Sequence, residues 1–242
     1  TTTAFSQFGP DVVWTGQEII VAWSDDANAS AASDIRFRRF DAELKPLGPE
    51  ETLSADAASE ADVTLCAFGA GFAAAFRSTQ DGDETVVVKA GATLWTLGPH
   101  IGGPAGDRPA LVALDATTLA VAYSVTTEDG ETGVRFARLS TAKPGVAEPK
   151  VLTVTGEAQP LAARTAHPAL ARVGARSFLT WTSQMGGVRD VWLGELGDAG
   201  LLGVELALPR EIVHGAGDQS RSVIGPSALG PEGALAALWQ DD

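Results

Sequence analysis

The chain has 242 residues, of which 45% are hydrophobic, and its formal net charge is −14. This hydrophobic content is sufficient for a buried core and excludes a wholly disordered chain. No run of about 18 apolar residues occurs, so we expect no transmembrane helix and no membrane insertion. The acidic balance argues against nucleic acid, because phosphate binding requires clustered lysine and arginine, and we interpret it as a solubility feature.

The first module of the chain covers 10–24 and contains two short apolar runs, at 12–14 and 19–23, separated by Gly16. Runs of this length and composition around a turn residue predict a hairpin of two well-buried strands. The segment 34–40 then alternates between apolar and charged residues, which predicts a third strand with one basic face. A turn at 41–48 and a short outermost strand at 51–54 complete the module.

The same module recurs along the whole chain. The aromatic residue that closes each hairpin falls at 23, 76, 123, 181 and 239, so the period is near 50 residues. Four short strands per repeat of this length are typical of a β-propeller. We therefore predict an all-β fold in which 1–242 forms a single five-bladed β-propeller domain. Its inner hairpins are expected near 10–24, 62–77, 109–124, 168–182 and 222–240.

The last blade is incomplete in the sequence, because the inner hairpin occurs five times and the outer two strands only four times. The N-terminal segment 1–8 precedes the first module in the way that 51–54 precedes the second. We therefore predict that this N-terminal strand closes the C-terminal blade, with 2–6 paired to one of its strands.

The amino-acid sequence of the first repeat resembles that of a known group of proteins. The motifs VAWSD at 21–25, IRFRRFDA at 35–42 and PLGPE at 46–50 resemble a repeat of bacterial, often myxobacterial, secreted or lipoprotein β-propellers. The resemblance covers essentially the whole chain. It implies an extracellular, periplasmic or lipoprotein-anchored setting, and it implies no activity.

Acidic residues are concentrated in the loop after each closing aromatic residue. In a propeller these loops emerge on one face, so acids from different repeats would be gathered there. Asp81, Asp83 and Glu84 form the strongest local group, and carboxylate oxygens at this density could hold Ca²⁺. The alternative interpretation is that they are solvated turn residues. No other cofactor is expected.

Basic residues stand just before the first strand of the later repeats, on the same face. Arg108, Arg164, His167 and Arg221 are the candidates for ligand binding. Convergent cationic and polar groups at the propeller axis could bind an anionic or sugar ligand. The alternative is that they form salt bridges and turn caps between blades.

Two classes of function remain open. The first is a binding or scaffold domain that presents its axial face to a glycan, a peptide or another protein. The second is a glycoside hydrolase of the five-bladed kind, for which Asp11, Asp62 and Asp107 are the only plausible carboxylates. We place Asp11 and Asp62 at equivalent positions of the repeat, which favours a structural role, because a catalytic set should break the repeat. The binding interpretation is therefore preferred.

Overall fold

The computed structural model describes residues 6–26, 32–100, 107–126, 132–143, 150–151, 153–154, 165–183, 190–196, 205–213, 219–226 and 234–241. These residues form five sheets, which we call blades 1 to 5. No helix that could cross a membrane occurs in these ranges.

The strands of each blade follow the chain order, with neighbours antiparallel. Blade 1 contains β1 (Gln7–Trp14), β2 (Ile19–Asp25), β3 (Asp34–Phe40) and β4 (Glu51–Ser54). Blade 2 contains β5 (Ser59–Phe68), β6 (Gly71–Gln80), β7 (Asp83–Ala90) and β8 (Thr93–His100). Blade 3 contains β9 (Ala110–Ala113), β10 (Thr118–Thr126), β11 (Thr132–Ser140) and β12 (Lys150–Val151).

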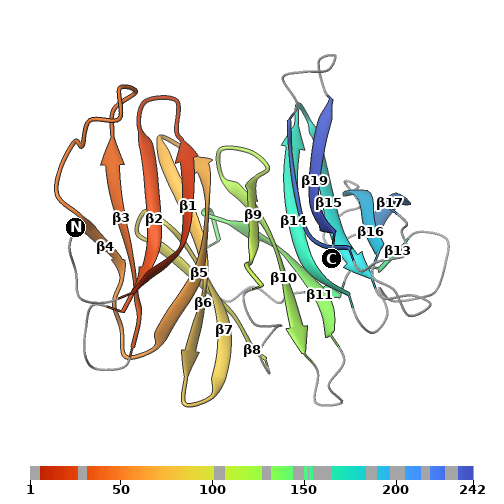
Figure 1. The fold of residues 1–242 in the computed structure, drawn as a ribbon, viewed down its shortest axis with the longest axis horizontal. Helices are drawn as coiled ribbons and strands as arrows, with labels where there is room; N and C mark the ends of the chain where they lie inside the picture. Colours follow the sequence, from red (N-terminus) through yellow and green to blue (C-terminus); the bar gives the residue numbers. More distant parts are fainter. Residues whose placement is uncertain are drawn as a thin grey trace.

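The last two blades differ in size. Blade 4 contains β14 (Thr165–Val173), β15 (Arg176–Ser183), β16 (Asp190–Leu196) and β17 (Glu205–Val213), with β13 (Thr153–Val154) parallel to β17 at its outer edge. Blade 5 contains β18 (Gln219–Pro226) and β19 (Leu235–Asp241). The first strands of successive blades contact one another in the order β1, β5, β9, β14, β18, so they line a common axis (Figure 1). The chain is a five-bladed β-propeller, as the repeat predicts.

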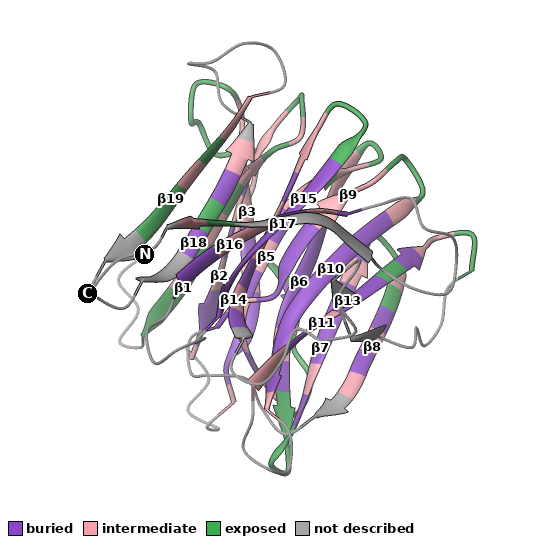
Figure 2. Ribbon diagram, turned by 90° about the vertical axis from the view of Figure 1, so that its right-hand side faces the viewer, coloured by how far each residue is buried: buried purple, intermediate pink, exposed green. Residues whose placement is uncertain are grey.

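Each pair of blades that follow one another along the chain encloses one hydrophobic cluster among the described residues. Clusters join blades 1 and 2 around Ile20 and Phe76, blades 2 and 3 around Trp95 and Tyr123, and blades 3 and 4 around Trp181. A smaller cluster joins blades 4 and 5. A middle blade is therefore covered on both faces, which is why its second strand is buried along consecutive residues instead of alternate ones (Figure 2).

Blades 1 and 5 each keep one face with exposed apolar side chains. Val12 on β1 is 60% exposed and Leu238 on β19 is 73% exposed. The described part of the predicted closing segment belongs to blade 1, because Gln7 and Phe8 pair with β2 and the Ser6 carbonyl accepts the Asp26 N–H. Residues 1–5 lie outside the described residues, so closure of blade 5 by them stays a prediction.

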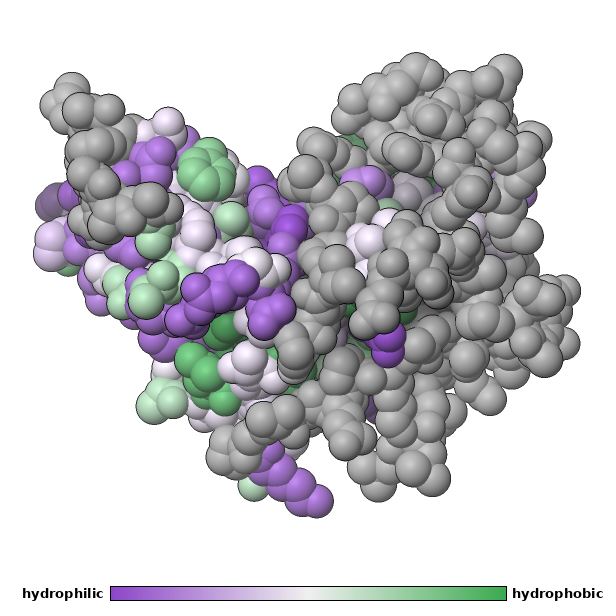
Figure 3. All heavy atoms as spheres, turned by 90° about the horizontal axis from the view of Figure 1, so that it is seen from below, coloured by the Kyte–Doolittle hydropathy of each residue, from purple (hydrophilic) through white to green (hydrophobic). Residues whose placement is uncertain are grey.

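The first strands begin, and the second strands end, at the same end of the propeller, which we call the axial end. Figure 3 shows this end from below, where hydrophilic side chains gather beside apolar ones. The turn between β6 and β7 also lies there (Figure 1). Side chains from blades far apart in sequence can therefore meet at this end.

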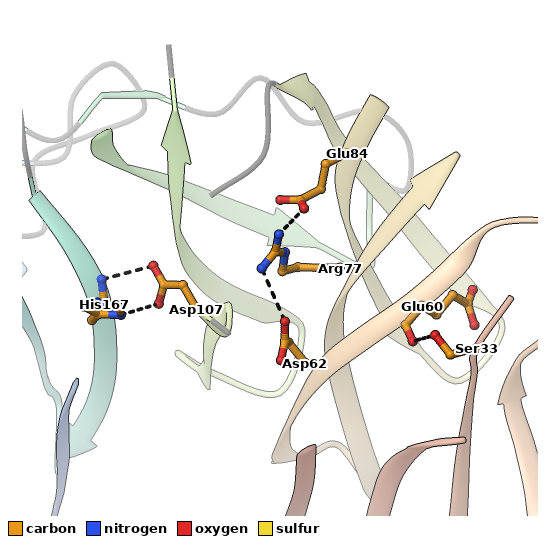
Figure 4. Close-up of polar contacts among 7 residues, drawn as sticks. All are labelled: Ser33, Glu60, Asp62, Arg77, Glu84, Asp107 and His167. Carbon is orange, nitrogen blue, oxygen red and sulfur yellow. Dashed lines mark hydrogen bonds and ion pairs between the residues drawn. The ribbon is translucent and has the colours of Figure 1, made fainter. Parts of the chain in front are cut away.

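A buried carboxylate joins the outer part of blade 1 to blade 2. Glu60 is 0% exposed, and its side chain accepts hydrogen bonds from the Ser54 hydroxyl and, over 3.3 Å, from the Ile35 N–H. Its own carbonyl accepts the Ser33 hydroxyl at 2.7 Å (Figure 4). Burial raises the pKa of Glu60 to about 7, and the nearby charges of Asp56 and Asp34 act in the same direction, against the two hydrogen bonds.

This carboxylate makes the stability of the propeller depend on pH. In the unfolded chain its pKa returns to near 4.5, so between that pH and about 7 only the folded state keeps the proton. The free energy of unfolding should therefore fall as pH rises through this window, by up to about 3 kcal/mol. Glu60→Gln imitates the protonated side chain. In this variant the free energy of unfolding, measured with urea, should not show this decrease between pH 5 and pH 8.

The matched control is Glu195→Gln. The hydrogen bonds from Arg176 lower the pKa of Glu195. The stabilisation of the fold by this carboxylate is therefore lost only in acid, as pH falls through the pKa of Glu195, and not between pH 5 and pH 8. This variant should keep the wild-type loss between pH 5 and pH 8. An unchanged pH dependence in Glu60→Gln would contradict the assignment.

Candidate functional site

A β-bulge lies at the start of the first strand in four of the five blades, at the axial end. In β1, β5, β14 and β18 this strand carries one extra residue relative to its partner. The residues at the first bulge position and its equivalent in blade 3 are Gly9, Asp62, Arg108, His167 and Arg221. Gly9, Asp62 and His167 have φ values of 59°, 60° and 54°, a conformation that non-glycine residues adopt at a cost.

A pocket of about 480 Å³ opens at the propeller axis, and we call it the axial pocket. Its wall is formed by residues from the first strands of all five blades, with apolar side chains such as Leu65, Leu111 and Leu170. Its polar residues are Asp11, Thr64, Asp107, Arg108, His167 and Ser222. An apolar wall with a few convergent polar groups is the usual composition of a small-ligand site.

Asp107 and His167 form the most ordered part of this pocket (Figure 4). The His167 N–H donates to Asp107 Oδ2 over 3.1 Å, and His167 Nδ1 lies 3.2 Å from Asp107 Oδ1. The same N–H also lies 3.2 Å from the Ser124 hydroxyl oxygen. Asp107 is 6% exposed. These bonds fix the orientation of the carboxylate and hold the strained His167 backbone in place.

Arg108 crosses from blade 3 to blade 1. Its Nη1 donates to the Pro10 carbonyl over 3.0 Å, and its Nη2 would lie 3.6 Å from a Cβ placed on Gly9. That distance is an ordinary contact, so the positive φ of Gly9 is what favours glycine there.

Asp11 faces the pocket from blade 1. Its Oδ2 accepts the Leu65 N–H of blade 2 over 2.7 Å. Burial raises the pKa of Asp11, although this hydrogen bond, another from Val12 and the charge of Arg108 oppose the rise. Asp11 therefore holds its proton to a higher pH than an exposed aspartate does.

A second charged group lies beside the pocket. Arg77 Nη1 is 3.3 Å from Asp62 Oδ2, and its Nη2 is paired with Glu84 (Figure 4). Burial raises the pKa of Asp62, with the charges of Asp107 and Glu84 adding to the rise and those of Arg77 and Arg108 opposing it. The pKa of Asp62 therefore depends on the charges of Asp107 and Arg108, which line the axial pocket.

The structure separates the three residues of the predicted calcium site. Asp81 in the β6–β7 turn and Asp83 at the start of β7 are exposed, whereas Glu84 is buried and directed at Arg77. No group of three His, Cys, Asp or Glu side chains placed to hold a metal ion occurs among the described residues. The structure thus does not gather Asp81, Asp83 and Glu84 into a cage.

Of the predicted ligand-binding residues, Arg108 and His167 meet in the axial pocket. Arg164 lies outside the described residues. The backbone of Arg221 belongs to β18, and its neighbour Ser222 lines the pocket. Nothing is described of the Arg221 side chain.

The predicted equivalence of Asp11 and Asp62 is wrong. Asp11 pairs with Ala22, and the equivalent of Ala22 in blade 2 is Ala75, which pairs with Thr64. Asp62 instead corresponds to Gly9, because Asp11 lies 12 residues before the closing Trp23 whereas Asp62 lies 14 residues before the closing Phe76. Both aspartates therefore break the repeat, which removes the argument against a functional role for them.

Comparisons with known proteins support the fold. No family model matches the chain, and no curated protein matches its sequence. A solved protein of unknown function from Dyadobacter fermentans is similar over 92% of this chain and 72% of its own, with a TM-score of 0.59 and 10% identity. An α-L-arabinofuranosidase from Lactobacillus brevis is similar over 100% of this chain and 85% of its own, with a TM-score of 0.51 and 11% identity.

A third solved structure is a GH43 β-xylosidase/α-arabinofuranosidase from a compost metagenome, solved with xylotriose. It is similar over 99% of this chain and 92% of its own, with a TM-score of 0.51 and 10% identity. The likeness shows the fold. At these identities it leaves the ligand and the chemistry of this chain to be argued from its own site.

Proposed function

We propose that this chain binds a carbohydrate in the axial pocket. The observation that carries the proposal is the composition of that pocket, in which Asp107, Arg108 and His167 line a cavity that also has apolar walls. A sugar offers hydroxyl groups to such donors and acceptors, and its C–H surface suits the apolar wall. The acceptors Asp11 and Asp107 disfavour an anionic ligand, which they would repel.

The propeller fold adds an argument by analogy. Two of the structures described above carry names of enzymes that act on sugars, and one of them was solved with xylotriose. This analogy favours a glycan over the peptide or protein that the sequence left open. A concave pocket of about 480 Å³ also suits a short oligosaccharide better than a protein partner, which would need a flatter surface.

Arg108→Ala tests the carbohydrate site. The probe is the oligosaccharide that binds the wild type most tightly on a glycan array, and isothermal titration calorimetry measures the affinity. Loss of the guanidinium from the pocket should weaken binding at least about tenfold.

The control is Arg172→Ala, because Arg172 also donates to a carbonyl of another blade, that of Ala113 over 3.2 Å, without lining the pocket. It should leave the affinity unchanged. Equal losses in the two variants, or none in Arg108→Ala, would refute the site.

Hydrolysis of a glycosidic bond is a second candidate, favoured by one observation. Asp11 and Asp107 are two carboxylates in one pocket, and burial raises the pKa of Asp11. Asp11 could then donate its proton to the leaving oxygen as the C–O bond breaks. Asp107 would accept a proton from the water that adds to the anomeric carbon.

Asp11→Asn tests this second candidate, with release of reducing ends from xylotriose and arabinotriose as the measurement. If Asp11 is the proton donor, the variant should lose at least about a hundredfold in kcat/KM. Wild-type activity should also fall as pH rises through the raised pKa of Asp11. Asp115→Asn, in the β9–β10 turn, is the control and should keep full activity. A wild type that binds these sugars without cleaving them would eliminate hydrolysis and leave the binding proposal standing.

A further inference from the structure

A second cavity of about 480 Å³ lies between blades 1 and 2, away from the axial pocket. It is formed where β3 ends and β4 begins, and by the β5–β6 turn and the end of β7. We call it the blade 1–2 groove. The lining residues that carry the argument are Phe37, Arg39, Glu51, Phe68, Phe72 and Lys89.

Aromatic side chains from both blades form the floor of this groove. The rings of Phe37 and Phe72 are 5.3 Å apart between centroids and are tilted by 58°. The guanidinium carbon of Arg39 lies 5.3 Å from the Phe37 centroid and 5.9 Å from the Phe72 centroid. Phe37 is buried and Phe72 is half-buried, so of these two rings Phe72 is the one that a ligand could touch.

The charges around the groove already balance one another. Arg39 is paired with Glu18, and its Nε is 3.1 Å from Glu51 Oε1. Lys89 donates to the Leu53 carbonyl over 2.6 Å. A phosphate or carboxylate ligand would have to compete with Glu18 and Glu51 for Arg39, so an anion is disfavoured. The groove suits a neutral ligand that has both hydroxyl groups and an apolar face.

This combination breaks the repeat. Arg39 pairs with Ile20, which lies three residues before the closing aromatic Trp23. Phe72 lies four residues before Phe76, the closing aromatic of blade 2. At the three other junctions the equivalent pairs are Ala90 with Leu119, Arg138 with Ser177, and Glu195 with Leu235. Only the junction of blades 1 and 2, among these described residues, brings a cation over an aromatic ring of the next blade. A structural feature of the fold would recur, so the exception points to a ligand.

We infer that the blade 1–2 groove is a second binding site for a neutral carbohydrate. A sugar ring would lay its C–H face on Phe72 and exchange hydrogen bonds with Glu51, which is 47% exposed on its side chain, and with Arg39. The choice of a sugar rests on the proposed function, while the groove itself does not. Two sites on one chain would increase the avidity for a long polysaccharide.

The test uses ¹⁵N-labelled protein titrated with neutral trisaccharides of xylose, arabinose, glucose and mannose. The backbone amide signals of Phe72 and Gly91 report on the groove, and those of Asp107 and His167 report on the axial pocket. At least one trisaccharide should shift both sets. In Arg39→Gln/Phe72→Leu, binding at the groove should weaken at least about tenfold, with the axial affinity unchanged. Thermal unfolding checks that the variant is folded, and Phe72→Leu alone is the milder version.

Arg176→Gln is the matched control. Arg176 lies 4.9 Å from the Phe178 centroid and makes two hydrogen bonds to Glu195, of 2.8 Å and 2.6 Å, so it repeats the chemistry of Arg39 outside either cavity. It should change neither affinity.

Shifts at Asp107 and His167 alone would overturn the groove and leave the proposed function intact. Shifts at Phe72 and Gly91 alone would support the groove and count against the axial site. No shift with any trisaccharide, or a double variant that binds at the groove as the wild type does, would overturn the inference.

Discussion

The extra residue at the start of the first strand is the constraint on which the axial site depends. It takes one position out of the hydrogen-bonded ladder, so the side chain there need not match its neighbours in the sheet. The backbone cost is met by Gly9 in blade 1 and by hydrogen bonds in blade 4, where Asp107 and Ser124 accept the His167 N–H. The same position can therefore be glycine, an acid or a base in successive blades.

A repeat fold becomes an asymmetric binding site through such positions. The four clusters between blades are built from similar aliphatic and aromatic side chains, which carry the stability. The residues that differ from blade to blade converge at two places, the axial pocket and the blade 1–2 groove. Both places combine an apolar surface with a few charged groups that already have protein partners. That arrangement keeps the charges oriented before a ligand arrives.

Much of the fold could be predicted from the sequence, because strand length, turn residues and the period near 50 are local properties. The inner hairpins, the third strands such as Asp34–Phe40 and the place of Arg108 and His167 at one end all follow from them. The bulge could not be predicted, since one unpaired residue leaves the hydrophobic pattern on both sides intact. The equivalence of Asp11 and Asp62 failed for a different reason, since Asp11 stands 12 residues before its closing aromatic and Asp62 stands 14 before its own, a difference that the sequence already contained.

Two other features of the sites had different causes. Because side chains alternate along β7, Glu84 points inward and Asp83 points outward. The sequence contained this alternation, but the closeness of the three acids along the chain suggested a calcium site instead. The contact of Arg39 with Phe72 depends on how two blades pack, and no local pattern contains that information.

The central claim, that the axial pocket holds a carbohydrate, is tested most directly by a crystal structure with the tightest-binding oligosaccharide from a glycan array. We predict density for the sugar in the pocket, within hydrogen-bonding distance of Arg108 and His167, whether or not a second molecule occupies the groove. Sugar bound only elsewhere, with the axial pocket holding solvent alone at saturating concentration, would contradict the account.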